Sequence, residues 1–176
     1  MKLYVAAFPN LGFKDQWIHE KRSKYDPVAK FIPPHLTLVF PSTAFNIDEL
    51  RQETSKLVRG FEPFRVVLRS AIVMPEVGNS RSHAHVFLVP DEGFSQIVRL
   101  HDRLYSGILA NELRLDIPYI PHLTVAAGLH LTHAKSVADD LNGMKFQITI
   151  EISGVNIIEI REQESDRFID HPIPLG

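Results

Sequence analysis

The tetrapeptide Pro-His-Leu-Thr occurs twice in this chain, at residues 34–37 and again at 121–124. A similar order of segments surrounds both copies: a short apolar strand that closes with proline, a helical stretch, the motif, a second helical stretch and another strand. Self-similarity at one fixed period is typical of a repeated structural unit. The repeat therefore predicts a duplicated half-domain, folded as two pseudo-symmetric lobes with a cleft between them.

Hydrophobic periodicity and turn residues locate the elements of each half. Thr132 is the expected N-cap of the last helix, and residues 76–82 are expected to form a flexible loop between the halves. The pattern predicts one domain, residues 1–176, with lobes at about 1–75 and 83–176. We expect strands at 3–8, 32–40, 64–69, 85–90, 119–127 and 146–151, helices at 14–25, 47–58, 94–109 and 132–141, and a final strand pair at 155–160 and 167–169.

Composition narrows the classes of function. The formal net charge is -2, so the chain lacks the strong positive field of proteins that follow long nucleic acids. The absence of cysteine excludes disulfide frameworks, thiol nucleophiles and zinc–cysteine sites. The apolar run before Pro9 is too short for a signal-peptide core or a membrane span. We expect a cytoplasmic protein without a membrane partner, with no long duplex as ligand and with a monomer as the favoured state.

The two motifs place chemistry on one surface. Side chains alternate along a strand, so His35 and Thr37 share a face about 7 Å apart, while Leu36 points to the core. His122 and Thr124 repeat this arrangement. A single His-x-Thr is more often structural, but two copies at equivalent positions favour function. Histidine can accept or donate a proton near neutral pH, and threonine hydroxyls can donate hydrogen bonds to phosphate oxygens. The pattern predicts acid–base catalysis at phosphorus that requires no metal or other cofactor.

These motifs resemble those of the 2H (two-histidine) phosphoesterase superfamily, which includes 2'-5' RNA ligase-like proteins and cyclic nucleotide phosphodiesterases. The resemblance spans nearly the whole chain, although only the two motifs are specific. It implies an α+β, duplicated bilobal fold in which two antiparallel sheets face a central cleft, with helices on the outside. It also implies that His35 and His122 are catalytic and that Thr37 and Thr124 bind the substrate phosphate. The family's substrates are 2',3'-cyclic phosphates, 2'-5' linkages and related RNA ends, so a small nucleotide or an RNA end is the expected substrate.

Further residues could contact the substrate. Tyr4, Phe8 and Tyr119, like Phe13 and Trp17, could stack on a base. Core packing is the commoner use of such aromatic side chains. Arg81 and His83 lie near the strand that opens the second half, and His83 shares a strand face with His85. Other basic side chains that could contact phosphate are Lys14, Arg69 and Arg114.

The residues leave four functions open. The first is hydrolysis of a 2',3'-cyclic phosphate, and the second is RNA-end processing or 2'-5' ligation by the same chemistry. A nucleotide-binding module without turnover is a third, which the two intact motifs disfavour. A metallohydrolase using His83 and His85 is the fourth, and a His-x-His pair without nearby carboxylates is a weak metal signal.

Overall fold

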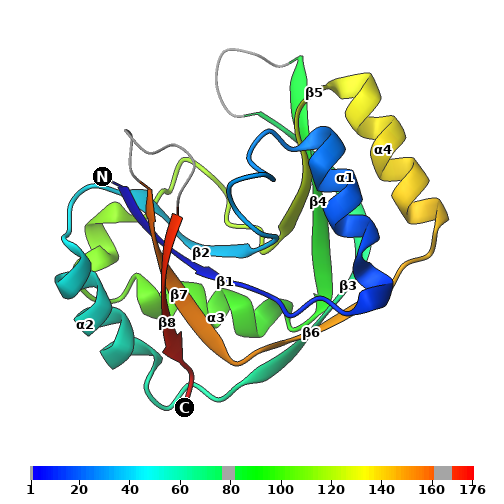
Figure 1. The fold of residues 1–176 in the computed structure, drawn as a ribbon. Helices are drawn as coiled ribbons and strands as arrows, with labels where there is room; N and C mark the ends of the chain where they lie inside the picture. Colours follow the sequence, from blue (N-terminus) through cyan, green and yellow to red (C-terminus); the bar gives the residue numbers. More distant parts are fainter. Residues whose placement is uncertain (1, 77–81, 161–167) are drawn as a thin grey trace.

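The computed structural model describes residues 2–76, 82–160 and 168–176. Helices are interspersed among the strands, except that β4 follows β3 directly and β6, β7 and β8 are consecutive; two short 3-10 helices, η1 and η2, accompany them (Figure 1). The strands are β1 (Lys2–Ala7), β2 (Leu36–Ser42), β3 (Phe64–Pro75), β4 (His83–Glu92), β5 (Leu123–His130), β6 (Ile148–Ile152), β7 (Gly154–Ile160) and β8 (Phe168–Pro174). The helices are η1 (Phe13–Asp15), α1 (Trp17–Tyr25), α2 (Ile47–Val58), α3 (Phe94–Leu104), η2 (Ile108–Glu112) and α4 (Leu131–Gly143).

The strands form two antiparallel half-sheets that meet at their inner edges. The full order is β6-β3-β4-β5-β2-β1-β7-β8, and the central strands β5 and β2 share a single ladder pair, Leu36 with Leu123. The α+β class and the antiparallel pairing are confirmed. The two predicted sheets are the two halves of this one curled sheet, joined where the repeated motifs lie.

Each half-sheet contains strands from both halves of the sequence. The strand β3 pairs with β4 and β6, although it belongs to the first repeat. The strand β7 pairs with β1, and β8 continues that half-sheet. The predicted lobe boundaries, 1–75 and 83–176, therefore do not coincide with the division of the sheet. Alternating apolar residues give a strand its faces but do not identify its partner, so the sequence pattern could not show this exchange.

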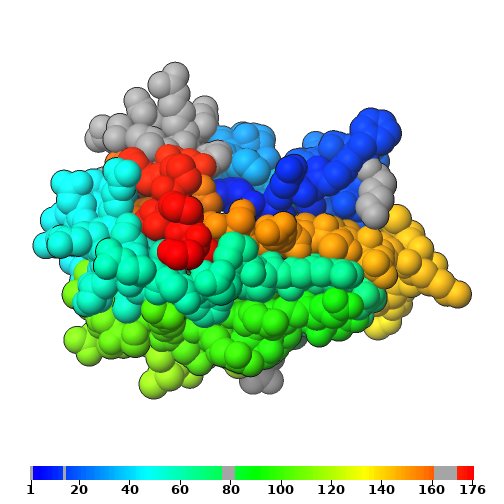
Figure 2. All heavy atoms as spheres, turned by 90° about the horizontal axis from the view of Figure 1, so that it is seen from below, coloured from blue at the N-terminus to red at the C-terminus, as the bar shows by residue number. Residues whose placement is uncertain are grey.

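The helices cover the core face of the sheet. The helix α1 follows β1 but packs on β5, and α3 follows β4 but packs on β2. Each of these helices therefore packs on the half-sheet that does not contain the strand before it, which is a pseudo-symmetric arrangement. The helix α4 lies over β3 and β4, and α2 lies against α3 and the last two strands. Figure 2 shows β8, in red, beside α2, in cyan, with α4, in yellow, at the opposite end of the molecule. The opposite face of the sheet is thus available for the paired motifs.

Local sequence explains the limits of several elements. Asn46 and Glu49 form a reciprocal capping box at the start of α2, which confirms the helix predicted at 47–58. The prediction of Thr132 as an N-cap is wrong: His130 holds the cap position of α4, and the Thr132 hydroxyl lies 3.1 Å from its Nδ1. Among the described residues, no helix is long and apolar enough to cross a membrane.

The motif strands begin later than predicted. They start at Leu36 and Leu123, so both motif histidines lie just before a strand. Prolines explain the difference, because they lack the N–H that a ladder needs. Pro33 and Pro34 precede the first histidine, and Pro118 and Pro121 precede the second.

Candidate functional site

The junction of the half-sheets brings the two motifs together in a crossed arrangement. Because Leu36 pairs with Leu123 in antiparallel register, His35 lies opposite Thr124 and Thr37 lies opposite His122. Cβ atoms of directly opposed residues are about 5 Å apart. Both leucines are buried in the core, so the other four side chains lie on the opposite face. Each histidine is therefore beside the threonine of the other motif.

The two imidazoles have the same tautomer. Nδ1 of His35 lies 2.9 Å from the carbonyl oxygen of Pro33, and Nδ1 of His122 lies 2.6 Å from that of Ile120. A carbonyl oxygen can only accept, so each Nδ1 carries a proton and donates it. The remaining nitrogen, Nε2, is then the atom that can accept or release a proton. The same contact, to the residue two positions earlier, orients both catalytic candidates.

Two cavities open on the two sides of this centre. The larger, of about 430 Å³, is lined by His122 and Thr37. The smaller, of about 270 Å³, is lined by His35 and Thr124. His85 and Phe87 line both, so the cavities adjoin along β4. The crossed pairs thus divide a continuous hollow into two compartments.

His122 lies in an aromatic and apolar environment. Its ring stacks on Phe87 with a centroid separation of 3.6 Å and an interplanar angle of 12°. Burial lowers the pKa of His122 to about 4, and the nearby imidazoles of His35 and His85 act in the same direction. In the free protein this imidazole is therefore neutral at pH 7.

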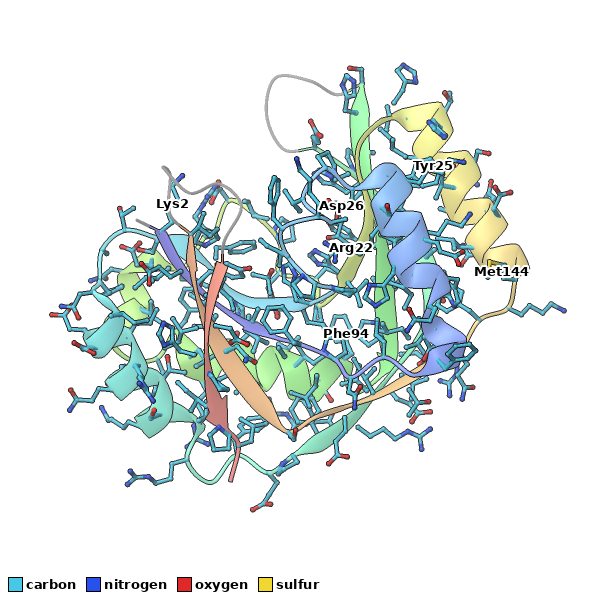
Figure 3. The ribbon with its side chains drawn as sticks, viewed as in Figure 1. Lys2, Arg22, Tyr25, Asp26, Phe94 and Met144 are labelled. Carbon is cyan, nitrogen blue, oxygen red and sulfur yellow. The ribbon has the colours of Figure 1, made fainter. Side chains whose placement is uncertain are left out.

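His35 has more polar neighbours. Arg22, on α1, lines the smaller cavity with Asp26, and the two form a buried ion pair with Nη2 and Oδ2 2.8 Å apart. Figure 3 shows both side chains on the side of α1 that faces the middle of the molecule. A second Arg22 nitrogen donates to the carbonyl oxygen of Ile32 at 2.9 Å. Burial lowers the pKa of His35 as well; the Pro33 hydrogen bond and Asp26 oppose this effect, and the positive charge of Arg22 adds to it.

The predicted aromatic contacts have different positions. Tyr119 lines the larger cavity and donates from its hydroxyl to the carbonyl oxygen of Thr37 at 3.0 Å. Tyr4 and Phe8 lie beside His35, with ring centroids 5.9 and 5.8 Å from it, and line neither compartment. Tyr4 is nearly inaccessible, so its hypothetical role in base stacking has little support. It packs against the imidazole instead.

The remaining sequence candidates whose side chains the structure describes do not line the two cavities, and the side chain of Lys14 is not among them. Arg81 lies outside the described residues. His83 faces His130 at the far end of β4, with ring centroids 6.3 Å apart, and Nδ1 of His83 lies 3.0 Å from the Ser82 hydroxyl. Trp17 packs on Phe146. The other candidates with described side chains are Phe13, which is almost fully exposed, and Arg69 and Arg114, which are bound to carboxylates.

The structure adds residues that the sequence did not identify as candidates. Arg22 lies in a polar helical segment and Glu76 begins the predicted loop at 76–82, and neither has a distinguishing sequence pattern. His85 was considered only together with His83, as a pair that could reach the cleft or hold a metal. The alternation of β4 was the available signal, because His83, His85 and Phe87 share one face. Only the register of β4 against β5 shows that His85 and Phe87 lie at the cleft.

The metal hypothesis finds no ligand set in the described residues. Across 2–76, 82–160 and 168–176, no three His, Asp or Glu side chains gather in a way that could hold a metal ion. His85 has one carboxylate nearby, Glu76, with Nε2 and Oε1 4.0 Å apart. A catalytic zinc normally has three protein ligands, so this pair is incomplete.

Comparison with known proteins supports a common origin. A family model described as the 2'-5' RNA ligase superfamily matches residues 13–164. The protein named Putative phosphoesterase OB1230, from Oceanobacillus iheyensis, is 30% identical over 131 residues, which are 73% of this chain and 72% of that protein. A Bacillus licheniformis protein named Putative phosphoesterase BLi01284/BL02661 is 30% identical over 130 residues, with the same two shares.

Known structures share the fold. TT0787 of Thermus thermophilus aligns with a TM-score of 0.61 at 19% identity, over 99% of this chain and 98% of that one. Usb1 of Kluyveromyces marxianus with uridine monophosphate gives 0.57 at 10% identity, over 99% and 98%. LigT of E. coli complexed with 3'-AMP gives 0.53 at 18% identity, over 99% and 96%.

Proposed function

The chain belongs to the 2'-5' RNA ligase superfamily of phosphoesterases, and from that premise we propose that it cleaves 2',3'-cyclic phosphates or 2'-5' linkages of nucleotides and RNA ends. The observation that carries the proposal is the crossed set of two histidines and two threonines at the junction of the half-sheets. Displacement at phosphorus needs a proton acceptor on one side and a proton donor on the other. Two imidazoles with free Nε2 atoms meet that need.

In the proposed mechanism the phosphate lies between the two cross-strand pairs. Thr37 and Thr124 donate hydrogen bonds to its non-bridging oxygens, where negative charge increases in the transition state. One Nε2 takes the proton of the attacking oxygen, and the other gives a proton to the leaving oxygen. The backbone bonds of Nδ1 keep both rings oriented throughout the cycle. No step requires a metal.

The two compartments suggest how the rest of the substrate is held. The larger cavity has the volume of a small-molecule site, and its wall includes Tyr119, Phe40 and Phe87. Aromatic side chains can stack on an unpaired base, so we assign the nucleoside to this side. The smaller cavity beside His35 then takes the water or the alcohol on the other side of phosphorus.

Room on both sides of the phosphate favours RNA-end processing as a second candidate. A cyclic nucleotide occupies one compartment and leaves the other to water. An RNA end or a 2'-5' linkage carries a group on each side, and the cavity of about 270 Å³ beyond His35 offers space for the second group. Usb1 with uridine monophosphate and LigT with 3'-AMP are folds of this type that bind nucleotides in their own structures.

Product analysis tests the proposal directly. The purified protein is incubated with each nucleoside 2',3'-cyclic phosphate and with 2'-5' and 3'-5' dinucleotides, and phosphorus NMR identifies the monoester or cyclic product. We expect turnover to survive prolonged chelation, because imidazoles move the protons. Activity that disappears with chelator and returns with zinc or magnesium would contradict the mechanism. Failure to turn over any of these diesters would reject the proposed substrate class.

A further inference from the structure

The larger cavity contains two polar groups that the proposed reaction does not use. Thr37 and His122 belong to the phosphate centre, and the Tyr119 hydroxyl is bound to a backbone carbonyl. Glu76 and His85 remain. The other described residues of the wall are apolar or aromatic: Phe40, Met74, Pro75, Phe87, Ile117, Pro118 and Ile120. A carboxylate and an imidazole in such a wall can select a ligand by its hydrogen bonds.

The tautomer of His85 is opposite to that of the two motif histidines. Its Nδ1 accepts a hydrogen bond from the backbone N–H of Gly128 at 3.3 Å, so its Nε2 carries the proton. Gly128 has a φ of 66°, a conformation that glycine adopts without strain. His85 therefore offers a hydrogen-bond donor and cannot serve as the general base while this bond persists.

Glu76 provides the complementary acceptor. Its Oε1 lies 4.0 Å from Nε2 of His85, which is too long for a direct hydrogen bond. Both side chains are about one-third exposed, at 33% and 32%. A ligand in the cavity can therefore meet a carboxylate and an imidazole N–H side by side.

The pair lies where the base of a bound nucleotide would be. The rings of His122, Phe87 and His85 are nearly parallel and follow one another along the cleft, with centroid separations of 3.6 and 5.8 Å. His85 is thus two ring positions away from the histidine beside the phosphate. In a nucleotide, the hydrogen-bonding edge of the base is separated from the phosphate by the ribose and the base ring.

We propose that Glu76 and His85 recognise guanine, through its N1–H and N2 amino group on the carboxylate and its O6 on the imidazole Nε2–H. Guanine carries two adjacent donors, which match the two oxygens of a carboxylate, and an acceptor next to them. Uracil presents one N–H between two carbonyls, and these would face the carboxylate with lone pairs. Adenine and cytosine present a single amino group on this edge. This inference rests on the proposed function, because it requires the nucleoside in the larger cavity.

Equilibrium binding tests the base preference without relying on turnover. Isothermal titration calorimetry measures the Kd of 3'-GMP, 3'-AMP, 3'-CMP, 3'-UMP and 3'-IMP for the full chain. We expect 3'-GMP to bind about tenfold to a hundredfold more tightly than 3'-UMP, as for other bidentate base contacts. Inosine lacks the 2-amino group and should fall between them, since it keeps N1–H and O6.

A matched pair of substitutions assigns the preference to the carboxylate. Glu76→Gln keeps the size of the side chain and replaces one acceptor oxygen with a donor, so the preference for 3'-GMP should largely disappear. Glu62→Gln makes the same chemical change at an exposed position outside the cavity lining and should leave the preference intact. The ligand pair of 3'-GMP and 3'-IMP gives the same information on unmodified protein.

The outcomes separate this inference from the proposed function. Equal Kd values for all the bases, or a guanine preference that survives Glu76→Gln, would overturn the recognition pair. Selective binding of 3'-GMP without turnover of any cyclic phosphate or dinucleotide would leave the pair standing and overturn the proposed reaction. No binding of any 3'-nucleotide would overturn the recognition pair, and the turnover assay would decide the proposed reaction separately.

Discussion

Around His122 the cleft is aromatic and apolar, whereas around His35 it contains a buried ion pair. The two histidines share the same backbone contact and the same tautomer. They differ in their neighbours: Phe87 stacks on His122, while Arg22 and Asp26 share the smaller cavity with His35. The two halves thus share the orientation of Nε2, the proposed proton-transfer atom.

In the proposed mechanism, this difference gives separate tasks to otherwise equivalent sites. Both motifs keep an imidazole, a threonine and a carbonyl acceptor, which are the groups that the proposed displacement at phosphorus uses. The walls of the two cavities differ, and these walls are what a substrate with two unlike ends would contact. A pseudo-symmetric centre with unlike walls can therefore bind an unsymmetrical diester in one orientation. The comparison can be tested by changing one side at a time.

The largest expected effect comes from removing either imidazole. His35→Ala and His122→Ala should each lower kcat by about 10²-fold or more, the usual cost of losing a general acid or base. The double variant should be little worse than the poorer single one, because both groups act in one proton-transfer cycle. His83→Ala, on the same strand face as His85 but outside the cavities, is the control. Loss of activity in that control with a tolerant His35→Ala would make the paired motif structural.

The threonines come next and test the crossed pairing. Thr37→Ala and Thr124→Ala should each slow turnover by about one to three powers of ten, through lost hydrogen bonds to the transition state. In a double-variant cycle, Thr37 should couple more strongly to its cross-strand neighbour His122 than to His35. The reverse order of coupling energies would mean that the strands do not work in the register seen here. Steady-state kinetics on all single and double variants provide the values.

The ion pair beside His35 should matter for stability. Asp26→Asn leaves the buried guanidinium of Arg22 without its counter-charge while keeping the size of the side chain. We expect a loss of about 1–3 kcal/mol in the free energy of unfolding. Urea denaturation of the variant measures it. Asp48→Asn, on the exposed side of α2, is the matched control and should change stability little. Equal stability of both variants would show that Asp26 contributes little.

The pH profile should show both lowered pKa values. The reaction needs one neutral and one protonated imidazole, so kcat/KM should be largest between the two free-enzyme ionisations. Because the pKa of His122 is lowered to about 4 and that of His35 lies below 6.5, the maximum should lie between about pH 4 and 6.5. The rate falls below this window as both rings become protonated, and above it as both become neutral. A plateau that continues to pH 8 would contradict the assignment.

The smallest effect is expected at the wall of the larger cavity. Tyr119→Phe removes only the hydrogen bond to the Thr37 carbonyl oxygen, which is worth about 1 kcal/mol. His101 stacks on the Tyr119 ring at 3.6 Å and should hold the phenylalanine ring in the same place. We therefore expect a few-fold change in KM for 2'-5' and 2',3'-cyclic substrates and little change in folding. An effect as large as that of Thr37→Ala would give Tyr119 a direct part in catalysis.

The sequence contained the centre of the site but not its surroundings. Because the repeated tetrapeptide carries its own strand signals, the positions of His35 and His122 on one face followed from side-chain alternation. Their catalytic role remains a prediction. Arg22 and Glu76 could not be found, since a single charged residue on a polar helix or in a loop has no pattern. They reach the cleft only through long-range packing.

For the fold, the local sequence likewise predicted individual elements but not how the strands pair. The helix at 47–58 has its cap and its period in local sequence, and the structure has the same limits. The exchange of β3 between the half-sheets left no local trace, because an alternating strand fits either edge. The choice between His83 and His85 likewise depended on the register of β4 against β5, which shifts next to His85.

The pairing of β7 with β1, and of β3 with β4 and β6, also sets the order in which the chain can complete its fold during synthesis. The strand β1 is flanked by β2 and by β7, so Lys2 pairs with Ile160 and Ala6 with Asn156. The half-sheet β2-β1-β7-β8 therefore has an open edge at β1 until β7 has left the ribosome. Pairing over such a separation is entropically costly and slow, and an unpaired edge invites association with other chains in the meantime. The half-sheet β6-β3-β4-β5 has all four of its strands once residue 152 has emerged. It is therefore the part that can nucleate folding before β1 pairs with β7.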